Sequence, residues 1–228
     1  MARGLVEELK EEGFRQLLLA HPFFHYAREE SLDQEQVTLF LSQYYLPIEY
    51  FTHYLSRLIS VTPAIEMQTH LSRILWQELG EGNPDQAHLT LYKSMMEQAG
   101  FDLSAIIQGR KLPATKQLVQ GYKDSTTNYL SGLGYLYGTE VIDLTIVSGL
   151  GEAVHQISQA EYFPWVDIHV KQEPNHVDSS EKAMQFSFTP REKQMVRLGA
   201  KDCWRKWYSF FSALQQSAEK IRRRKIKE

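Results

Sequence analysis

Apolar residues recur every three or four positions along most of this chain, and that spacing restricts the fold class more than any other feature. Side chains three or four apart line one face of a helix, which can then be buried. Leu5, Leu9, Phe14 and Leu18 show this pattern near the start. No segment has the sustained alternation of a half-buried strand, and the β-branched run at residues 141–147 is short and lies within a helical period. The pattern predicts an all-α protein.

Turn and capping residues indicate where the helices begin and end. Pro63 and Pro84 mark boundaries, because proline lacks the N–H that a helix interior needs. Ser31 followed by Gln34 has the form of a capping box, so we expect a helix to begin there. About seven helices result, including residues 5–19, 31–58, 64–79, 84–100, 116–157 as one helix or two, 169–176, and 191–225.

The composition is that of an ordinary globular protein. The 228 residues contain no Pro/Gly/Ser-rich linker, so we expect a single domain over residues 1–228. A formal charge of -3 does not favour nucleic acid as a partner. No apolar run approaches the roughly 20 residues of a membrane span, and the N-terminus is charged and amphipathic, unlike a signal peptide. We therefore expect a cytoplasmic protein that binds no membrane.

Cys203 is the only cysteine, which excludes a disulfide within the chain and fits a reducing compartment. It stands between Asp202 and Trp204 in a late amphipathic segment. That setting favours a packing role over a role as nucleophile.

His169, Glu173 and His176 have the spacing H-x3-E-x2-H, which places two imidazoles and a carboxylate on one face of a helix. Such a face is suited to binding a metal. No cysteine accompanies these residues, so iron or manganese fits the set better than structural zinc does.

Glu78 and His88 add the same ligand types in a neighbouring region. Glu78 is expected at a helix end, where the helix dipole disfavours a carboxylate unless a positive charge compensates it. The loop at residues 80–84 would bring the two flanking helices back together, so that His88 can share a site with Glu78. The plainer alternatives are a solvent-exposed glutamate and a buried structural histidine.

Glu140 lies in an unusual context, after Gly132, Gly134 and Gly138 and before an apolar run. Each glycine in a helix costs about 1 kcal/mol relative to alanine. Three of them therefore indicate close helix contact or space beside a bound molecule. A buried carboxylate such as Glu140 needs a partner. Glu49 is likewise a lone acid among aromatic and apolar residues, and is either a further ligand or exposed.

Five motifs over about residues 14–185 together carry a family resemblance. In chain order they are His21-Pro22-Phe23, Tyr44-Tyr45-Leu46, Glu78-x-Gly80-x-Gly82 with His88, Gly134-x3-Gly138-x-Glu140, and His169-x3-Glu173-x2-His176. They resemble the heme-oxygenase-like diiron oxidases and oxygenases, a group related to the chlamydial protein associated with death domains and to the thiaminase and pyrroloquinoline-quinone synthase branch.

The resemblance implies a bundle of about seven helices with a central metal site. It implies that the ligands are Glu78, His88, Glu140, His169, Glu173 and His176, with Glu49 as an optional seventh. Glu140 and His176 are the two that we expect to be essential for catalysis. The family usually has aspartate where this chain has Glu173, so the reach of that carboxylate should differ.

The same comparison argues against three reactions. The chlamydial relative sacrifices a tyrosine to make p-aminobenzoate, and the matching position here is Phe24. Thiaminase relatives use a mid-chain cysteine, whereas Cys203 comes far too late. Heme binding through His21 or His25 would leave the ordered set of glutamates and histidines unexplained.

The resemblance therefore implies two iron ions that cycle between Fe(II) and Fe(III), with O2 as co-substrate and a small carboxylate or amino acid as substrate. The reaction would be C–C cleavage, desaturation, N-oxygenation or nitrile formation. We expect an aromatic wall around the substrate, with Arg57, Lys123 or Arg73 as candidates to bind its carboxylate.

A homodimer is a further possibility. The alternatives are a zinc or mononuclear-metal hydrolase, and a non-catalytic interaction protein whose basic end at residues 220–227 binds an acidic partner.

Overall fold

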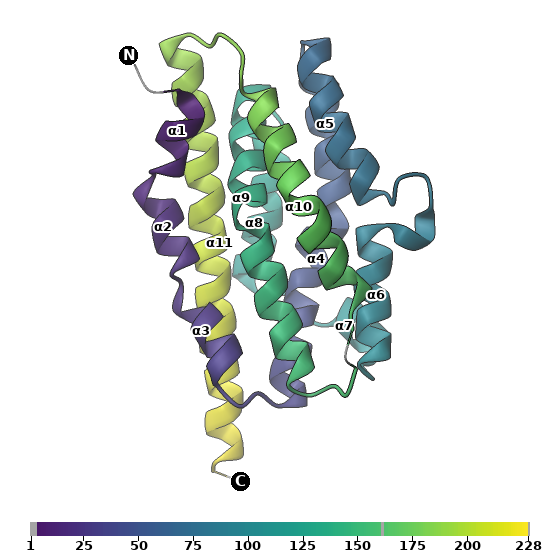
Figure 1. Cartoon of the computed structure of the whole chain (residues 1–228). Helices are drawn as coiled ribbons and strands as arrows, with labels where there is room; N and C mark the ends of the chain where they lie inside the picture. Colours follow the sequence, from purple (N-terminus) through teal and green to yellow (C-terminus); the bar gives the residue numbers. More distant parts are fainter. Residues whose placement is uncertain (1–3, 161, 228) are drawn as a thin grey trace.

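The computed structural model describes residues 4–160 and 162–227, and within them every regular element is a helix (Figure 1). The elements are α1 (Leu5–Lys10), α2 (Gly13–Leu19), α3 (Pro22–Glu29), α4 (Gln34–Val61), α5 (Ile65–Glu78), the 3-10 helix η1 (Pro84–Gln86), α6 (His88–Gln98), α7 (Leu103–Gln108), α8 (Pro113–Ser125), α9 (Tyr129–His155), α10 (Pro164–Ala183) and α11 (Pro190–Lys225). The expected all-α class is confirmed. Seven of the described helices, α4, α5, α6, α8, α9, α10 and α11, have eleven or more residues.

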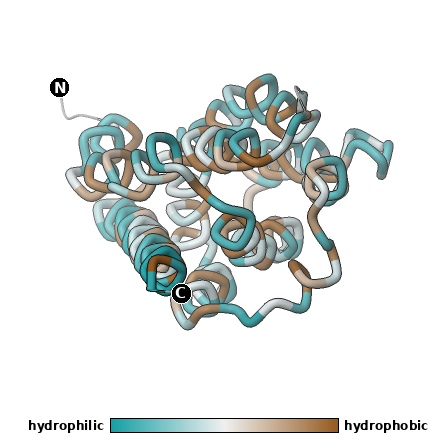
Figure 2. The backbone as a smooth tube through the Cα atoms, turned by 90° about the horizontal axis from the view of Figure 1, so that it is seen from below, coloured by the Kyte–Doolittle hydropathy of each residue, from teal (hydrophilic) through white to brown (hydrophobic). Residues whose placement is uncertain are grey.

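Helix α9 is the centre of the bundle and contacts α3, α4, α8, α10 and α11. It is buried on nearly every side, as expected for a helix that is apolar all round. The short helices α1 to α3 run along α11, and α5 and α6 cover the opposite side beside α4 (Figure 1). In the end-on view of Figure 2, hydrophilic and hydrophobic residues alternate around most helices, the pattern of amphipathic packing.

Close contact between α9 and α11 explains the glycines of α9. A Cβ atom added to Gly134 would lie 1.9 Å from the carbonyl oxygen of Val196, and one added to Gly199 would lie 2.2 Å from that of Ser131. The two backbones therefore meet where neither residue has a side chain. Of the two reasons offered for these glycines, close helix approach applies at Gly134.

Several helix boundaries differ from the sequence expectation. The first helix is interrupted between α1 and α2, and α6 begins at His88 because η1 occupies the preceding residues. The capping box of α4 is Asp33 with Gln36, not Ser31 with Gln34. Gln36 also donates to Tyr26 Oη at 2.8 Å and to the carbonyl of Ala218 at 3.1 Å. These buried tertiary contacts fix the start of α4 at this position.

The basic end of α11 has acidic partners within the chain. Arg224 Nη2 lies 2.7 Å from Glu35 Oε2, and Lys225 Nζ lies 2.9 Å from Asp33 Oδ2. Arg222 also pairs with Glu30. Three of the basic residues that were considered for an acidic partner are thus paired within the chain, Arg224 and Lys225 with the start of α4 and Arg222 with the end of α3. In the part of the chain that the structure describes, no helix is long and apolar enough to cross a membrane.

Candidate metal centre

The bundle brings together all six residues that the resemblance named as principal ligands. Glu78 comes from the end of α5, His88 from the start of α6, Glu140 from α9, and His169, Glu173 and His176 from α10. Each of the six is no more than 6% exposed. Carboxylates and imidazoles at this depth need strong partners, because burying an unpaired polar or charged group is costly.

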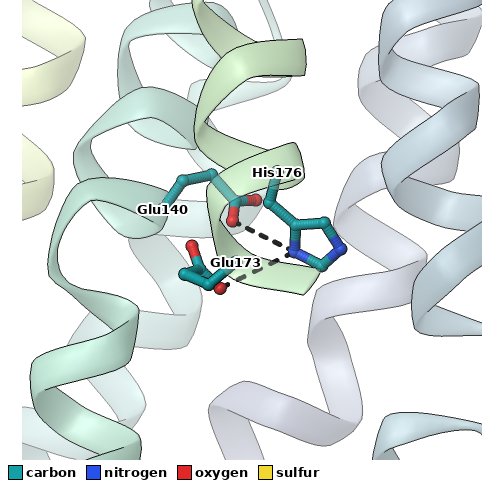
Figure 3. A group of neighbouring side chains, drawn as sticks. All are labelled: Glu140, Glu173 and His176. Carbon is teal, nitrogen blue, oxygen red and sulfur yellow. Dashed lines mark ion pairs between the residues drawn. The ribbon is translucent and has the colours of Figure 1, made fainter. Parts of the chain in front are cut away.

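The α10 face meets Glu140 directly. In Figure 3, Glu140 points from α9 towards Glu173 and His176 of α10. His176 Nδ1 lies 3.5 Å from Glu140 Oε2 and 3.7 Å from Glu173 Oε2. One ligand atom from each of the three residues falls within 4.8 Å of the others, which is close enough for a single ion to bind all three.

The loop between α5 and α6 brings Glu78 back to His88. Its Gly80 and Gly82 have φ angles of 82° and 90°, and a Cβ on Gly80 would lie 2.2 Å from the carbonyl oxygen of Asn83. Glu78 Oε1 consequently lies 3.1 Å from His88 Nδ1 and 3.7 Å from His176 Nδ1. Glu78 therefore faces the α6 histidine and the α10 histidine together.

Asp143 is a site residue that the sequence analysis missed. Its Oδ2 lies 3.7 Å from His169 Nε2, and its Oδ1 accepts a hydrogen bond of 3.2 Å from Tyr44 Oη. Asp143 follows Glu140 by three residues on α9, so both carboxylates leave the same face. That i, i+3 spacing is the signal that would have identified it.

Hydrogen bonds behind the histidines fix which nitrogen faces the carboxylates. The Nε2–H of His88 can donate to Gln172 Oε1 at 3.0 Å, and the Nδ1–H of His169 can donate to the carbonyl of Trp165 at 2.7 Å. The opposite nitrogen of each ring is turned towards Glu78 or Asp143, where it could bind a metal once it carries no proton. Such support from behind is usual for histidines that bind metals.

Several buried atoms of the cluster have no hydrogen-bond partner among the described residues. They are His88 Nδ1, Glu140 Oε1, both carboxylate oxygens of Glu173, and His176 Nε2. A buried polar atom without a partner costs about 1–3 kcal/mol, and more when it is charged. A cation bound by these atoms would remove that cost.

The pKa values show how strongly the cluster needs positive charge. Burial, together with Glu140 and Glu78, raises the pKa of Asp143 to about 7. Burial also raises the pKa of Glu173 well above its usual value, again with Glu140 contributing.

The histidines respond to the same charges. Burial alone would lower the pKa of His176, but Glu140 and Glu78 outweigh it and raise that pKa to about 9. Burial alone would raise the pKa of Glu78, but the neighbouring histidines, mainly His88, outweigh it and lower that pKa to about 2. Burial, assisted by His88, lowers the pKa of His169 to about 3. Histidine protons thus supply part of the positive charge that the carboxylates require.

The donor set fits iron. Oxygen and imidazole ligands without thiolate suit iron or manganese. Glu78, Glu140, Asp143 and Glu173 carry four negative charges when ionised, which equals the positive charge of two divalent cations.

Two cavities reach the cluster from different sides. The smaller, of about 30 Å³, is lined by Glu78, Glu140, Asp143 and His169 together with Tyr44, Pro47, Ile48, Phe51, Tyr122, Thr139 and Trp207. The larger, of about 570 Å³, is lined by Lys10, Arg15, Tyr137, Glu140, Val141, Leu144, Glu173, Pro174, Val177 and Glu181. The expected aromatic wall belongs to the smaller cavity, which has room for only about two water-sized molecules.

Glu49 lies apart from this cluster. Its carboxylate accepts a hydrogen bond of 3.0 Å from Tyr45 Oη, and it lines a separate surface cavity with Arg57 and His53. Lys123 lies over the ring of Tyr50 at 5.2 Å. Neither Arg57 nor Lys123 lines the two cavities at the cluster.

The residues considered for other chemistries are accounted for by packing. Cys203 is fully buried beside Thr139, and burial raises the pKa of its thiol. His21 accepts from the backbone N–H of Phe23 and contacts Ser212 Oγ at 2.9 Å, so it caps α3. Phe24 packs against Phe211, with a ring separation of 4.8 Å.

Comparisons with known proteins identify the family of this chain. Residues 38–208 match a family described as "iron-containing redox enzyme". A 4-aminobenzoate synthase of Nitrosomonas europaea is 27% identical over 199 residues, which cover 80% of this chain and 79% of that protein.

Solved structures show the same fold. A CADD-like protein of unknown function from Nostoc punctiforme superposes with a TM-score of 0.74 at 16% identity, covering 94% of this chain and 96% of the other. A domain with a heme oxygenase-like fold from Shewanella denitrificans superposes with a TM-score of 0.76 at 14% identity, covering 96% of this chain and 93% of the other. The family match spans well over half of the sequence and the structures share its architecture, so this chain belongs to the family of iron-containing redox enzymes and has a heme oxygenase-like fold.

Proposed function

We propose that this protein is a non-heme diiron enzyme that uses O2 to oxidise a small carboxylate. The observation that carries the proposal is the cluster of three buried carboxylates and three buried histidines, with the half-buried Asp143 beside them and several atoms that lack partners among the described residues. The family match supports iron, and the size and charge of the cluster support two ions.

The ligands divide into two overlapping groups. Glu140, Glu173 and His176 would hold one ion. His88, His169 and Asp143 would contribute to the second, and Glu78 faces histidines of both groups. Ferrous iron bound there would supply electrons for the reduction of O2.

The protein's own part in the chemistry is positioning and exclusion. Pro47, Ile48, Phe51 and Trp207 close the smaller cavity with apolar surface, and its volume of about 30 Å³ suits a molecule the size of O2 rather than an organic substrate. Tyr44 Oη holds Asp143 Oδ1 at the wall of this cavity, so the pair offers a proton close to the ligands. The larger cavity leaves space for the substrate on the side of Glu140 and Glu173.

A separate substrate fits this chain better than oxidation of a protein side chain. Formation of 4-aminobenzoate is named for the Nitrosomonas relative. The position matched to the sacrificed tyrosine is Phe24, which has no hydroxyl group and is packed against Phe23 and Phe211. We therefore assign an external carboxylate as the molecule to be oxidised.

Oxygen consumption tests the proposal. Protein loaded anaerobically with Fe(II) should consume O2 when mixed with air-saturated buffer, and the right carboxylate should accelerate that consumption, since substrate binding should complete the site before O2 reacts. Protein loaded with Zn(II) is the control and should consume none. Ester or amide hydrolysis by the zinc form, with no iron-dependent O2 uptake, would favour the hydrolase alternative instead.

A further inference from the structure

The larger cavity contains a cation and a hydroxyl group that the metal centre does not use. Arg15 on α2 and Tyr137 on α9 both line it, and both have a buried polar atom without a hydrogen-bond partner among the described residues: Nε of Arg15 and Oη of Tyr137. The same cavity reaches Glu140 and Glu173. Unused donors and the metal ligands therefore border the same open cavity.

Arg15 is the cation of this cavity that remains available for a ligand. Lys10 also lines the cavity, but its Nζ lies 2.9 Å from Glu181 Oε1 and its side chain is half exposed. Within residues 4–160 and 162–227, Arg15 forms no ion pair, and its guanidinium donates only to the backbone carbonyl of Lys10, at 3.3 Å. A guanidinium has five N–H donors, so most of its hydrogen-bonding capacity is unused.

Tyr137 complements the guanidinium. Its side chain is fully buried, and burial raises the pKa of the phenol, with Glu181 contributing, so the hydroxyl keeps its proton and acts as a donor. Both groups line the same cavity, so one ligand could contact the guanidinium and the hydroxyl together. A guanidinium beside a neutral hydroxyl donor is suited to a carboxylate.

The other residues that line the larger cavity indicate what kind of chain the ligand has. Val141, Leu144, Pro174 and Val177 are aliphatic, and Tyr137 is the cavity's aromatic lining residue. An amine would need a free carboxylate, but Glu181 is paired with Lys10, and Glu140 and Glu173 belong to the metal centre. A volume of about 570 Å³ lies within the range of small-molecule sites.

We infer that Arg15 and Tyr137 form the subsite for the carboxylate of a straight-chain aliphatic acid, whose chain extends along Val141 and Val177 towards Glu140 and Glu173. This inference rests on the proposed function, because the acid is taken to be the substrate. It replaces Arg57, Lys123 and Arg73 as candidate anchors. It also places the substrate in the cavity between α1, α2, α9 and α10, and not in the smaller cavity.

Calorimetric titration with sodium octanoate tests the subsite, using both the protein as isolated and the protein loaded anaerobically with Fe(II). Arg15→Met removes the charge but keeps a long side chain, and the dissociation constant for octanoate should rise about 10- to 100-fold, the loss expected for one charge-assisted pair. Tyr137→Phe should weaken binding by a smaller factor. It retains the ring and provides a second test in case Arg15→Met lowers the thermal stability.

Arg205→Met is the matched control. Arg205 lies over the ring of Phe14, the residue before Arg15, but does not line the cavity, so octanoate binding should not change. Octylamine should bind far more weakly than octanoate. Equal octanoate affinity in the wild type and Arg15→Met, or equal affinity for octylamine, would overturn the inference. Octanoate binding can be measured without iron or O2. Failure of this inference can therefore be distinguished from failure of the proposed function, which would appear as an absence of iron-dependent O2 uptake.

Discussion

Glu78 Oε1 lies 3.1 Å from His88 Nδ1, although the two residues end one helix and begin another. The helix dipole disfavours a carboxylate at the end of α5, and in this structure the imidazoles of His88 and His176 compensate it. The compensation is incomplete across the whole cluster, which contains four carboxylates and three histidines. This excess of negative charge in a buried site is the main physical argument for bound cations.

Replacement of either Glu140 or His176 by alanine should abolish iron-dependent O2 consumption and remove iron from at least one position. The helices are held together by apolar faces, so the far-ultraviolet circular dichroism should stay almost unchanged. Iron content and O2 uptake measure the effect. Glu81→Ala is the control, because Glu81 is exposed and its carboxylate accepts a hydrogen bond from Gln77 outside the cluster. Loss of activity in Glu81→Ala with retention in Glu78→Ala would reverse the assignment of these two acids.

Gln172→Leu should weaken iron binding although Gln172 is not a ligand in this account. It removes the acceptor that orients His88, and loss of such a partner typically lowers metal affinity about 10- to 100-fold. Competition with an iron chelator under anaerobic conditions would measure the change. Gln98→Leu, on the exposed end of α6, should leave the affinity unaltered. An unchanged affinity in Gln172→Leu would show that the orientation of His88 does not depend on this contact.

Gly134→Ala should destabilise the bundle, because the new Cβ would overlap the carbonyl oxygen of Val196 on α11. Overpacking of this kind costs about 1–3 kcal/mol, and each kcal/mol lowers the melting temperature of a chain of this size by about 2–4 °C. Gly13→Ala is the comparison, since nothing lies within 4 Å of its Cβ position. That variant should be neutral or slightly more stable. Equal melting temperatures for the two variants would contradict the close contact between α9 and α11.

Metal-free Asp143→Asn should be more stable than metal-free wild type at alkaline pH. The folded pKa of Asp143 is about 7 against 3.8 for the free side chain, so the folded protein retains a proton that the unfolded chain has lost. Wild-type stability therefore falls between about pH 4 and pH 7, and asparagine removes that dependence. Melting temperatures should coincide near pH 4 and favour the variant at pH 8. A constant difference across this range would contradict the assigned pKa.

Much of the site could be predicted from sequence because its determinants are local. The spacing of His169, Glu173 and His176 fixes one helix face, and the Gly80 to Pro84 turn explains why Glu78 and His88 can meet. Asp143 was overlooked because Glu140 was treated as a lone acid, although a residue three positions later on a helix shares its face.

The substrate cavity could not be predicted in the same way. Arg15 lies 125 residues before Glu140, and no periodicity links them. Their relationship depends on how α2 packs beside α9 and α11, which is a tertiary result. For the same reason, the aromatic residues expected around the substrate are divided, with Tyr44 and Phe51 at the smaller cavity and Tyr137 at the larger.

Anaerobic titration with Fe(II), followed by Mössbauer spectroscopy of the loaded protein, tests the central claim most directly. The buried set of four carboxylates and three histidines predicts saturation near two irons per chain, with a coupled pair after exposure to O2. Binding at one of the positions can be the weaker, because ligands that must leave room for substrate need not hold iron tightly. A sharp endpoint at one metal ion per chain, with zinc preferred and no coupled iron signal, would contradict the account.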